Sequence, residues 1–460
     1  MRKNPWAILA LCGSSVLFAQ NGVVDPSYCG MTSPPSWCSG TEIGGWVTAA
    51  MKSPACGTGT NFFPSCSIVI PPNPAGGAYN QTTPINVPAS TTTEQTTFSL
   101  IFTRGATFNF TGSTNSKCGT VDSICIEPSI NEGSHVVIQD AHINLGSGAA
   151  SGIHSQMYGA YLIRPAINGY NTSQGSDLWL DGGGAEIDHP SLSLAESCIK
   201  LTSTSGRQPN AIHVWGGEFD GCSYGWYHDD DTNGFVHLGG GNLVKGVTME
   251  DVQFPVVDTG FVGLTLEDNY IEGEQNTAFQ LGGGTNQSYN ANVHGNVFNT
   301  PPNTVPKPPP EFVPIGLTNV YFSQIGPNTD VGNPKYAINY SDGSAQNAII
   351  GNDEMVTVTA LSALGSGGTA ACDTVDGYVC TSKTGVIRVV TGTGPAGGDL
   401  FQMYWPTSFS TPAVCQFQVL APLQSMLIAK DPSFNYGYQV KAWMGSAPSG
   451  TFSVSYICGS

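Results

Sequence analysis

A short apolar unit recurs along the middle of the chain at nearly even spacing, and this recurrence constrains the fold more than any other feature. Each unit has an aliphatic residue, four residues rich in Gly, Asn or Asp, and a second apolar residue. Nine units lie 24 to 30 residues apart, and they begin at Ile138, Leu162, Ile187, Val214, Leu238, Leu266, Val293, Val320 and Ile350. This period, without intervening helices, predicts a β-solenoid whose turns stack about 4.8 Å apart.

One alternative register stays open in the middle of the series. A unit that begins at Met249 fits the same pattern, but using it in place of Leu238 gives uneven intervals of 35 and 17 residues. We therefore favour the even series. In this register the first residue of each unit points into the core, and the residues before and after it point outward.

The segments that flank the repeat differ from it. Residues 1–19 have the basic start and apolar core of a secretory signal peptide. We expect a disulfide-bonded N-terminal cap at 20–70, with a short helix whose apolar stripe runs from Ile43 to Met51. The β-helix is expected at 71–365. Five strand-like runs between Gly, Pro and Ser predict a separate antiparallel β-sandwich at 384–460.

The cysteines indicate an oxidising compartment. The sequence has 13 Cys, and Cys12 lies within the signal peptide. The other Cys are even in number, which predicts disulfides between neighbours in the sequence. The expected pairs are Cys29–Cys38, Cys56–Cys66, Cys118–Cys125, Cys198–Cys222, Cys372–Cys380 and Cys415–Cys458.

Charge and apolar content exclude several classes of protein. Acidic residues outnumber basic residues 33 to 15, and the net charge is -18 at pH 7. Such a surface repels phosphate backbones, so we expect no nucleic-acid partner. A hydrophobic content of 40% is too high for a disordered chain. No segment after the signal peptide is apolar enough to span a membrane, so we expect an extracellular or cell-surface protein.

Several segments resemble the pectate-lyase-like superfamily of right-handed parallel β-helices, which includes tailspike-type proteins. They are the helix EIGGWVTAAM, the strand CSIVIPP, the segment INVPAS, the run FSLIFTRGATFNF, and the turns LTLEDNYIEG and VHGNVF. The resemblance covers about residues 40–360. It implies an all-β fold of about nine or more turns, with an N-terminal capping helix and a small C-terminal β-sandwich. It also implies that the chain cleaves or binds polysaccharide, and it leaves a homotrimer open.

The catalytic motifs of this superfamily do not carry over as a whole. The run Asp229-Asp230-Asp231 precedes Val293-His294-Gly295 without the flanking residues and the later basic motif of polygalacturonases. Arg164-Pro165 is only a fragment of the arginine motif of pectate lyases. The activity therefore has to be argued from the residues themselves.

The outward positions of the middle turns gather carboxylates, histidines and a tryptophan. Glu186 and Asp188 lie two residues apart on one expected strand, roughly 7 Å at about 3.3 Å per residue. This separation suits an acid and a base with a water between them, as in inverting glycosidases. His213, one turn away, is the third catalytic candidate because it can shift the pKa of either carboxyl. The candidates for substrate binding are Trp215, His237, Glu267, His294 and Tyr321.

Two further groups have simpler interpretations. Asp229, Asp230 and Asp231 form a candidate Ca²⁺ site, because Ca²⁺ takes oxygen ligands, although a solvated turn explains them as well. No other cofactor is indicated. Asn269 and Asn296 occupy the same place in their units, which predicts a ladder of stacked amides between turns.

Three functions fit these observations. The chain is a secreted polysaccharide hydrolase or lyase, a glycan-binding protein without cleavage, or a structural solenoid. The stripe of histidines and carboxylates favours the first two. In the third, the same residues are an ordinary solvated strand face.

Overall fold

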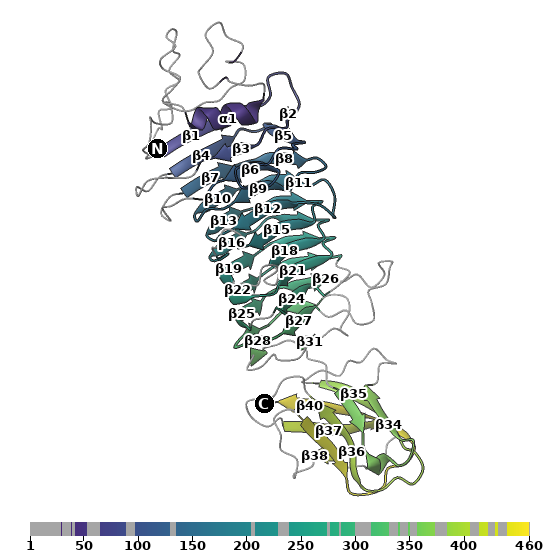
Figure 1. Ribbon diagram of the computed structural model, residues 1–460. Coiled ribbons are helices and arrows are strands. Elements are labelled where there is room, and N and C mark those ends of the chain that lie inside the picture. Colours follow the sequence, from purple (N-terminus) through teal and green to yellow (C-terminus); the bar gives the residue numbers. More distant parts are fainter. Residues whose placement is uncertain are drawn as a thin grey trace, which may run out of the picture.

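Three parallel sheets wind into a β-helix, and two small antiparallel sheets follow (Figure 1). The all-β fold predicted from the repeat is therefore confirmed. The computed structural model describes residues 29, 38, 42–52, 65–88, 97–128, 135–203, 208–228, 239–273, 277–284, 287–299, 314–330, 339–340, 348–349, 357–372, 384–404, 414–421, 428–430 and 439–459.

The first sheet carries the first apolar residue of each repeat unit. Its strands are β1 (Ser65–Ile70), β4 (Thr97–Phe102), β7 (His135–Gln139), β10 (Ala160–Ile163), β13 (Ala185–Asp188), β16 (Ile212–Trp215), β19 (Gly239–Lys245), β22 (Phe261–Glu267), β25 (Ser288–His294), β29 (Gln324–Ile325) and β32 (Ala348–Ile349), and β28 (Val320–Tyr321) also pairs with β25.

The second sheet carries the second apolar residue of each unit. Its strands are β2 (Tyr79–Gln81), β5 (Thr107–Phe110), β8 (His142–Leu145), β11 (Ala166–Asn168), β14 (Ser191–Ser193), β17 (Glu218–Asp220), β20 (Thr248–Glu250), β23 (Tyr270–Glu272), β26 (Val297–Asn299) and β30 (Thr329–Asp330).

The third sheet closes each turn. Its strands are β3 (Ile85–Val87), β6 (Asp122–Ile126), β9 (Ser151–Ser155), β12 (Ser176–Asp181), β15 (Ser197–Thr202), β18 (Tyr224–His228), β21 (Phe254–Asp258), β24 (Phe279–Gly282), β27 (Ile315–Thr318) and β31 (Asn339–Tyr340).

The core column of the first sheet follows most of the predicted register. Pairing stacks Ile138, Leu162, Ile187, Val214, Val244, Leu266, Val293, Ile325 and Ile349. The prediction was wrong at Val320, whose place Ile325 takes. Val244 stands where Leu238 was expected, and Ile349 where Ile350 was expected; both expected residues lie outside the described residues. The Met249 alternative was wrong too, because Met249 lies in the second sheet between Phe219 and Ile271.

Uneven loops explain these errors in register. The step from Val214 to Val244 is 30 residues, because residues 229–238 intervene between β18 and β19, and the step from Val244 to Leu266 is only 22. An even period therefore places the unit six residues too early in the chain, at Leu238 instead of Val244. The pairing identifies VKGVTM, which begins at Val244, as the unit of that turn.

A left-handed residue joins the first sheet to the second in each of these turns. The third residue of the unit has φ between 47° and 71° in seven turns, at Asp140, Arg164, His189, Gly216, Gly246, Asp268 and Gly295. Gly tolerates this conformation without strain, and Asp and Asn tolerate it better than most residues. The turn geometry thus explains why the centre of the unit is rich in these residue types.

The predicted asparagine ladder is present, and Asn328 extends it. Asn269 Nδ2 donates to Asn296 Oδ1, and Asn296 Nδ2 donates to Asn328 Oδ1, both at 2.9 Å. The same oxygens accept the backbone N–H groups of Asn269 and Asn296. Asn269 and Asn296 are fully buried, so these bonds satisfy polar groups that water cannot reach.

The predicted capping helix, α1 (Ile43–Met51), packs its apolar face on the first turns (Figure 1). A Cβ on Gly44 would lie 2.1 Å from the Thr83 carbonyl oxygen, so only glycine allows this close approach. Glu42, before the helix, accepts the N–H groups of Thr82 and Thr83 at 2.7 Å. The helix is therefore fixed to the turn between β2 and β3.

No helix in the described parts of the chain is long and apolar enough to cross a membrane.

The C-terminal part contains two four-stranded antiparallel sheets around their own core. One sheet has the order β33 (Thr357–Ala360), β36 (Gly398–Tyr404), β39 (Gln439–Met444) and β38 (Ile428–Lys430). The other has the order β34 (Thr369–Cys372), β35 (Thr384–Val390), β40 (Thr451–Gly459) and β37 (Val414–Ala421), and a 3-10 turn, η5 (Ser362–Leu364), follows β33.

Strand pairing shifts the expected domain boundaries of 71–365 and 384–460. Strand β1 already pairs with β4, and β33 and β34 pair within the C-terminal sheets. We therefore propose that the β-helix begins at residue 65 and that the C-terminal domain begins at residue 357.

Four of the expected disulfides join described residues: Cys29–Cys38, Cys118–Cys125, Cys198–Cys222 and Cys415–Cys458. Cys66 and Cys372 are also disulfide-bonded, whereas their expected partners Cys56 and Cys380 lie outside the described residues. Cys198 in β15 and Cys222 just before β18 come from adjacent turns, so this bond links neighbouring turns of the stack.

The asparagine ladder yields a stability prediction. Replacing Asn296 with Ala leaves Asn269 and Asn328 without their shared partner, at a cost of about 1–3 kcal/mol for each buried polar group left unsatisfied. We expect denaturant unfolding to show this loss. The control is Asn168→Ala on the outer face of β11, which should change stability by less than about 0.5 kcal/mol. Equal effects of the two substitutions would contradict a role for the ladder.

Candidate functional site

The predicted catalytic group comes together on the outer face of the first sheet. Parallel pairing of β13 with β16 sets Glu186 opposite His213 and Asp188 opposite Trp215. Glu186 and Asp188 flank the buried Ile187, so both carboxylates leave the same strand face. Both are accessible to solvent, and Trp215 is 39% exposed.

Glu186 is held by two neighbours from the next turn. His213 Nδ1 lies 2.7 Å from Glu186 Oε1, and the Trp215 indole N–H donates to Glu186 Oε2 at 2.9 Å. Both carboxylate oxygens are therefore engaged. The side chain is fixed in one orientation, as a group that transfers a proton must be.

His213 has an acceptor beside each of its ring nitrogens. Its Nδ1 faces Glu186, and its Nε2 lies 3.2 Å from the carbonyl oxygen of Gly241. Both partners accept, and a neutral imidazole has only one N–H to donate. Both contacts are hydrogen bonds at the same time only when His213 is an imidazolium, or when Glu186 is protonated and donates to Nδ1. In either of these forms the pair holds a proton that it can give away.

Asp188 has a different partner. His189 Nδ1 lies 2.7 Å from Asp188 Oδ1. His189 is a left-handed turn residue, and a Cβ on Gly216 would lie 3.0 Å from its ring, so glycine at 216 makes room for the imidazole. Asp188 Oδ2 makes no bond in the described structure and faces solvent. Asp188 is therefore the better candidate for activating a water molecule.

A charged group follows two and three turns further along the stripe. Lys245 Nζ lies 2.7 Å from Glu267 Oε1 and 3.9 Å from Asp268 Oδ2. The hydrogen bond to Glu267 and the nearby carboxylate charges raise the pKa of Lys245. Pairing sets Glu267 opposite His294, as predicted, and ligand atoms of Glu267, Asp268 and His294 lie within 4.8 Å of one another. The ammonium of Lys245 already compensates Glu267, which weakens this group as a cation site.

Other predicted site residues lie elsewhere. Tyr321 is off the stripe, because Ile325 and not Val320 occupies the core column. It pairs with Tyr289, and the two rings lie 5.9 Å apart in an aromatic cluster with the exposed Phe322. His237 and the candidate Ca²⁺ ligands Asp229, Asp230 and Asp231 lie outside the described residues.

The sequence contained signals for the site residues that were missed. Lys245 follows Val244 directly, so choosing VKGVTM as the unit would have placed it on the stripe. His189 and Asp268 occupy the third position of their units, where the left-handed turn projects them beside the stripe. Nothing in the pattern of a single turn indicated which neighbours they would contact.

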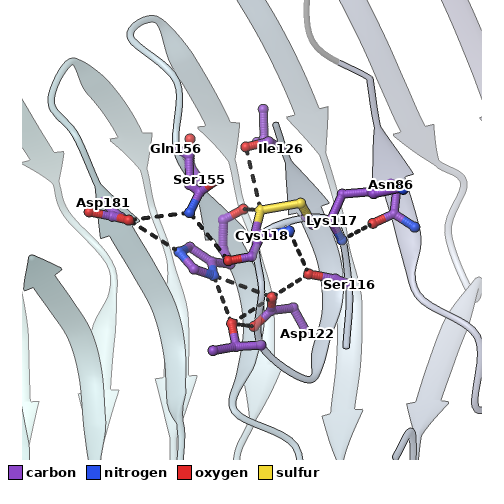
Figure 2. The surroundings of a disulfide bond; sticks show 12 residues. Asn86, Ser116, Lys117, Cys118, Asp122, Ile126, Ser155, Gln156 and Asp181 are labelled. Carbon is purple, nitrogen blue, oxygen red and sulfur yellow. Dashed lines mark hydrogen bonds and ion pairs between the residues drawn. A yellow bond between two sulfur atoms is a disulfide. The ribbon is translucent and has the colours of Figure 1, made fainter. Parts of the chain in front are cut away.

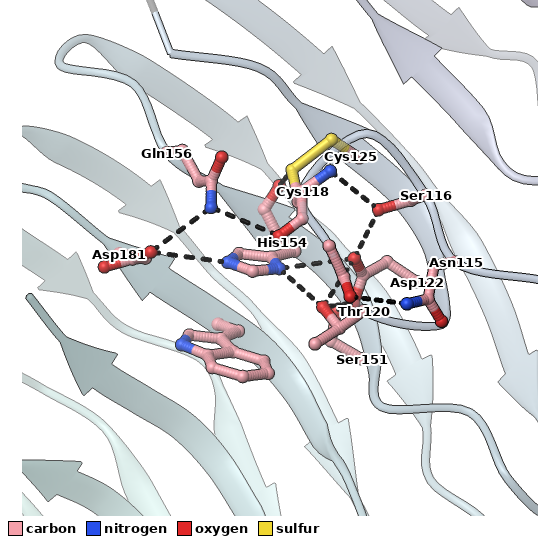
Figure 3. A network of polar contacts seen from close by, with 12 residues as sticks. Asn115, Ser116, Cys118, Thr120, Asp122, Cys125, Ser151, His154, Gln156 and Asp181 are labelled. Carbon is pink, nitrogen blue, oxygen red and sulfur yellow. Dashed lines mark hydrogen bonds and ion pairs between the residues drawn. A yellow bond between two sulfur atoms is a disulfide. The ribbon is translucent and has the colours of Figure 1, made fainter. Parts of the chain in front are cut away.

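A second polar cluster is buried on the third sheet, under the segment that the Cys118–Cys125 disulfide closes (Figure 2). His154 lies between two fully buried carboxylates, with Nδ1 3.2 Å from Asp122 and Nε2 3.9 Å from Asp181 (Figure 3). Its ring stacks on Trp179 at 4.4 Å. Since His154 is almost completely buried, this cluster holds the fold together and is closed to a polymer substrate.

The two carboxylates control the charge of His154. Burial alone would lower the pKa of His154, but the hydrogen bond to Asp122 and the negative charges of Asp122 and Asp181 outweigh it, so the pKa is raised. Burial would likewise raise the pKa of Asp122, but His154 and the hydroxyl groups of Ser116 and Ser151 lower it. The cluster is therefore an ion pair at mildly acidic pH.

Stability should follow this ion pair as pH changes. The raised pKa of His154 stabilises the fold fully below the unfolded value of about 6.5, and this contribution is lost as pH rises through the folded pKa. The lowered pKa of Asp122 gives a second contribution to stability. This contribution is present above the unfolded value of about 3.9 and is lost as pH falls through the folded pKa. We expect the melting temperature to peak between these values. His154→Asn should lower the melting temperature at its peak and make the melting temperature fall less steeply above neutral pH. The control His142→Asn on the second sheet should keep the wild-type dependence of melting temperature on pH.

Comparisons with known proteins add little to these observations. No family model matches the chain, and no curated protein matches it. Among solved structures, the tailspike protein of Pseudomonas phage LKA1 is 9% identical over 86% of this chain and 90% of that chain, with a TM-score of 0.33. The tailspike of Acinetobacter baumannii phage AM24 is 13% identical over 90% and 80%, with a TM-score of 0.37. The DFA-IIIase of Arthrobacter chlorophenolicus A6 is 14% identical over 68% and 92%, with a TM-score of 0.33.

Proposed function

We propose that the chain is a secreted protein that binds a polysaccharide on the outer face of the first sheet and hydrolyses its glycosidic bonds there. The observation that carries this proposal is the fixed Glu186–His213 pair beside Asp188 on the same strand face, with an exposed indole next to both. Hydrolysis requires a proton donor for the leaving oxygen and a base for water. Glu186, held by His213 and Trp215, suits the first role, and Asp188, which has one oxygen without a bond in the described structure, suits the second.

The proposed roles follow from the hydrogen bonds. The Glu186–His213 pair donates its proton to the glycosidic oxygen as the bond from that oxygen to the anomeric carbon breaks. Asp188 takes a proton from the water whose oxygen attacks the anomeric carbon. Trp215 offers an apolar face on which a sugar ring can stack. The reaction consumes one water and leaves a reducing end.

A second candidate is glycan binding without cleavage. It is favoured by the fact that both oxygens of Glu186 are already engaged by His213 and Trp215. A polysaccharide panel separates the two candidates. Release of reducing ends supports hydrolysis, ultraviolet-absorbing unsaturated products indicate a lyase, and retention without product indicates binding alone.

The catalytic proposal predicts the effect of removing each carboxylate. Glu186→Gln keeps an acceptor for the indole N–H but cannot donate the proton, and Asp188→Asn cannot accept one. We expect each to lower the rate of reducing-end release about 10²- to 10⁴-fold, the size of general acid–base contributions. Thermal unfolding should stay unchanged because both residues face solvent. The matched control is Glu218→Gln on the outer face of β17. Wild-type activity of the Glu186→Gln/Asp188→Asn double variant would refute this site.

The stacking role predicts a separate effect on binding. Trp215→Ala should weaken affinity by about 1–3 kcal/mol, by analogy with the stacking of bases on aromatic side chains. Affinity is best measured by calorimetry in the inactive double variant, so that cleavage does not consume the ligand. Tyr170→Ala removes an exposed aromatic ring from a different part of the helix and should leave affinity unchanged. A similar loss in both variants would indicate that Trp215 does not contact the glycan.

A further inference from the structure

The C-terminal domain presents a second candidate binding face, on the sheet that contains β36 and β39. Leu400, Phe401, Met403, Val440, Ala442 and Met444 of these strands fill the core of the domain. The other side chains of the two strands alternate with these. Trp443, Tyr404, Asp399 and Lys441 reach solvent, whereas Gln402 and Gln439 are buried. Antiparallel pairing arranges them in three adjacent pairs, Asp399 with Trp443, Gln402 with Lys441, and Tyr404 with Gln439.

Aromatic rings occupy opposite corners of this face. Trp443 is 41% exposed and Tyr404 is 38% exposed. Trp443 lies four positions along β39 from Gln439, the partner of Tyr404, which places the two residues roughly 13 Å apart along the strand at about 3.3 Å per residue. A Cβ on Gly445 would lie 3.1 Å from the indole of Trp443, so the ring rests over the glycine. One side of the indole is supported in this way, and Trp443 remains exposed to solvent.

The side chains between the two rings are polar and carry no net charge. Lys441 Nζ lies 3.1 Å from Asp399 Oδ2, so the two charges compensate each other. The Gln402 side-chain amide donates to the side-chain oxygen of Gln439. Among the described residues, the accessible part of this face thus combines two apolar platforms with the polar ends of Lys441 and Asp399, whose charges cancel, in a chain whose net charge is -18.

We propose that this face is a second carbohydrate-binding site, which takes a neutral glycan. The apolar sides of sugar rings stack on Trp443 and Tyr404, and their hydroxyl groups exchange hydrogen bonds with Lys441 and Asp399, which are partly exposed. A neutral ligand complements a face whose charges, among the described residues, are already paired. A protein partner or a second copy of this chain fits less well, because an apolar interface would bury Lys441 and Asp399 away from water. The inference does not depend on the function proposed for the first sheet.

Affinity electrophoresis of the full chain tests the proposal, with dextran, mannan, galactan, xylan or mixed-linkage β-glucan in the gel. We expect at least one of these to retard the wild-type protein. Trp443→Ala and Tyr404→Ala should each weaken the apparent affinity about 5-fold or more, the lower end of an aromatic stacking contribution. Gly445→Val should act in the same direction, because it keeps the indole but displaces it from its support.

Two controls show whether the retardation arises at this face. Ile457→Ala removes an exposed apolar side chain from the other sheet of the domain and should change nothing. A second series places the same variants on a Trp215→Ala background, where the stacking residue of the first sheet is absent, and the losses at the C-terminal face should be of the same size. Three results would overturn the inference: no retardation by any of the five polysaccharides, wild-type retardation of all three variants of the face, or losses that disappear on the Trp215→Ala background. A change of oligomeric state in Trp443→Ala at unchanged retardation, seen by light scattering, would identify the face as an interface between copies and would also overturn it.

Discussion

Parallel pairing between successive turns is the constraint on which the rest of the β-helix depends. Each strand of a turn completes its backbone hydrogen bonds only with the turns before and after it, and each turn buries its apolar residues only against its neighbours. A turn therefore keeps an aliphatic residue in the first-sheet column and a left-handed residue two positions later. The loops between strands are free to vary, and they do so by several residues from one turn to the next.

The same constraint assembles the candidate site. A one-residue shift of β16 against β13 would send His213 into the core and separate it from Glu186. In the observed register, residues 27 positions apart become lateral neighbours, and Trp215 reaches back over the strand to the same carboxylate. The asparagine ladder and the Cys198–Cys222 disulfide bind neighbouring turns to one another, which maintains this register. The site thus depends on buried contacts that never touch a ligand.

Most of the architecture could be predicted from the sequence, because the core residues of a parallel solenoid recur in the sequence once per turn. The column was correct wherever the steps along the chain were of similar length. It failed at Leu238 and Val320, where the steps to the core residue are 30 and 32 residues, and by one residue at Ile350. Glu186, Asp188, His213 and Trp215 were predicted together since they lie in two adjacent turns of regular length. The partners of these residues were not predictable in the same way. Whether His213 would also reach the Gly241 carbonyl, or His189 would bind Asp188, depends on left-handed turns and side-chain directions that the apolar pattern does not encode.

In the proposed mechanism, the hydrogen bond from Trp215 to Glu186 couples binding to proton transfer. The indole N–H draws electron density from one carboxylate oxygen, while His213 contacts the other. A sugar ring stacked on the indole would exclude water from this pair and strengthen both interactions, because a hydrogen bond is electrostatically stronger where the local dielectric is low. The occupied site would then hold its proton in a more defined geometry than the empty one. Under the proposed function, a single exposed tryptophan would thus both position the substrate and prepare the acid.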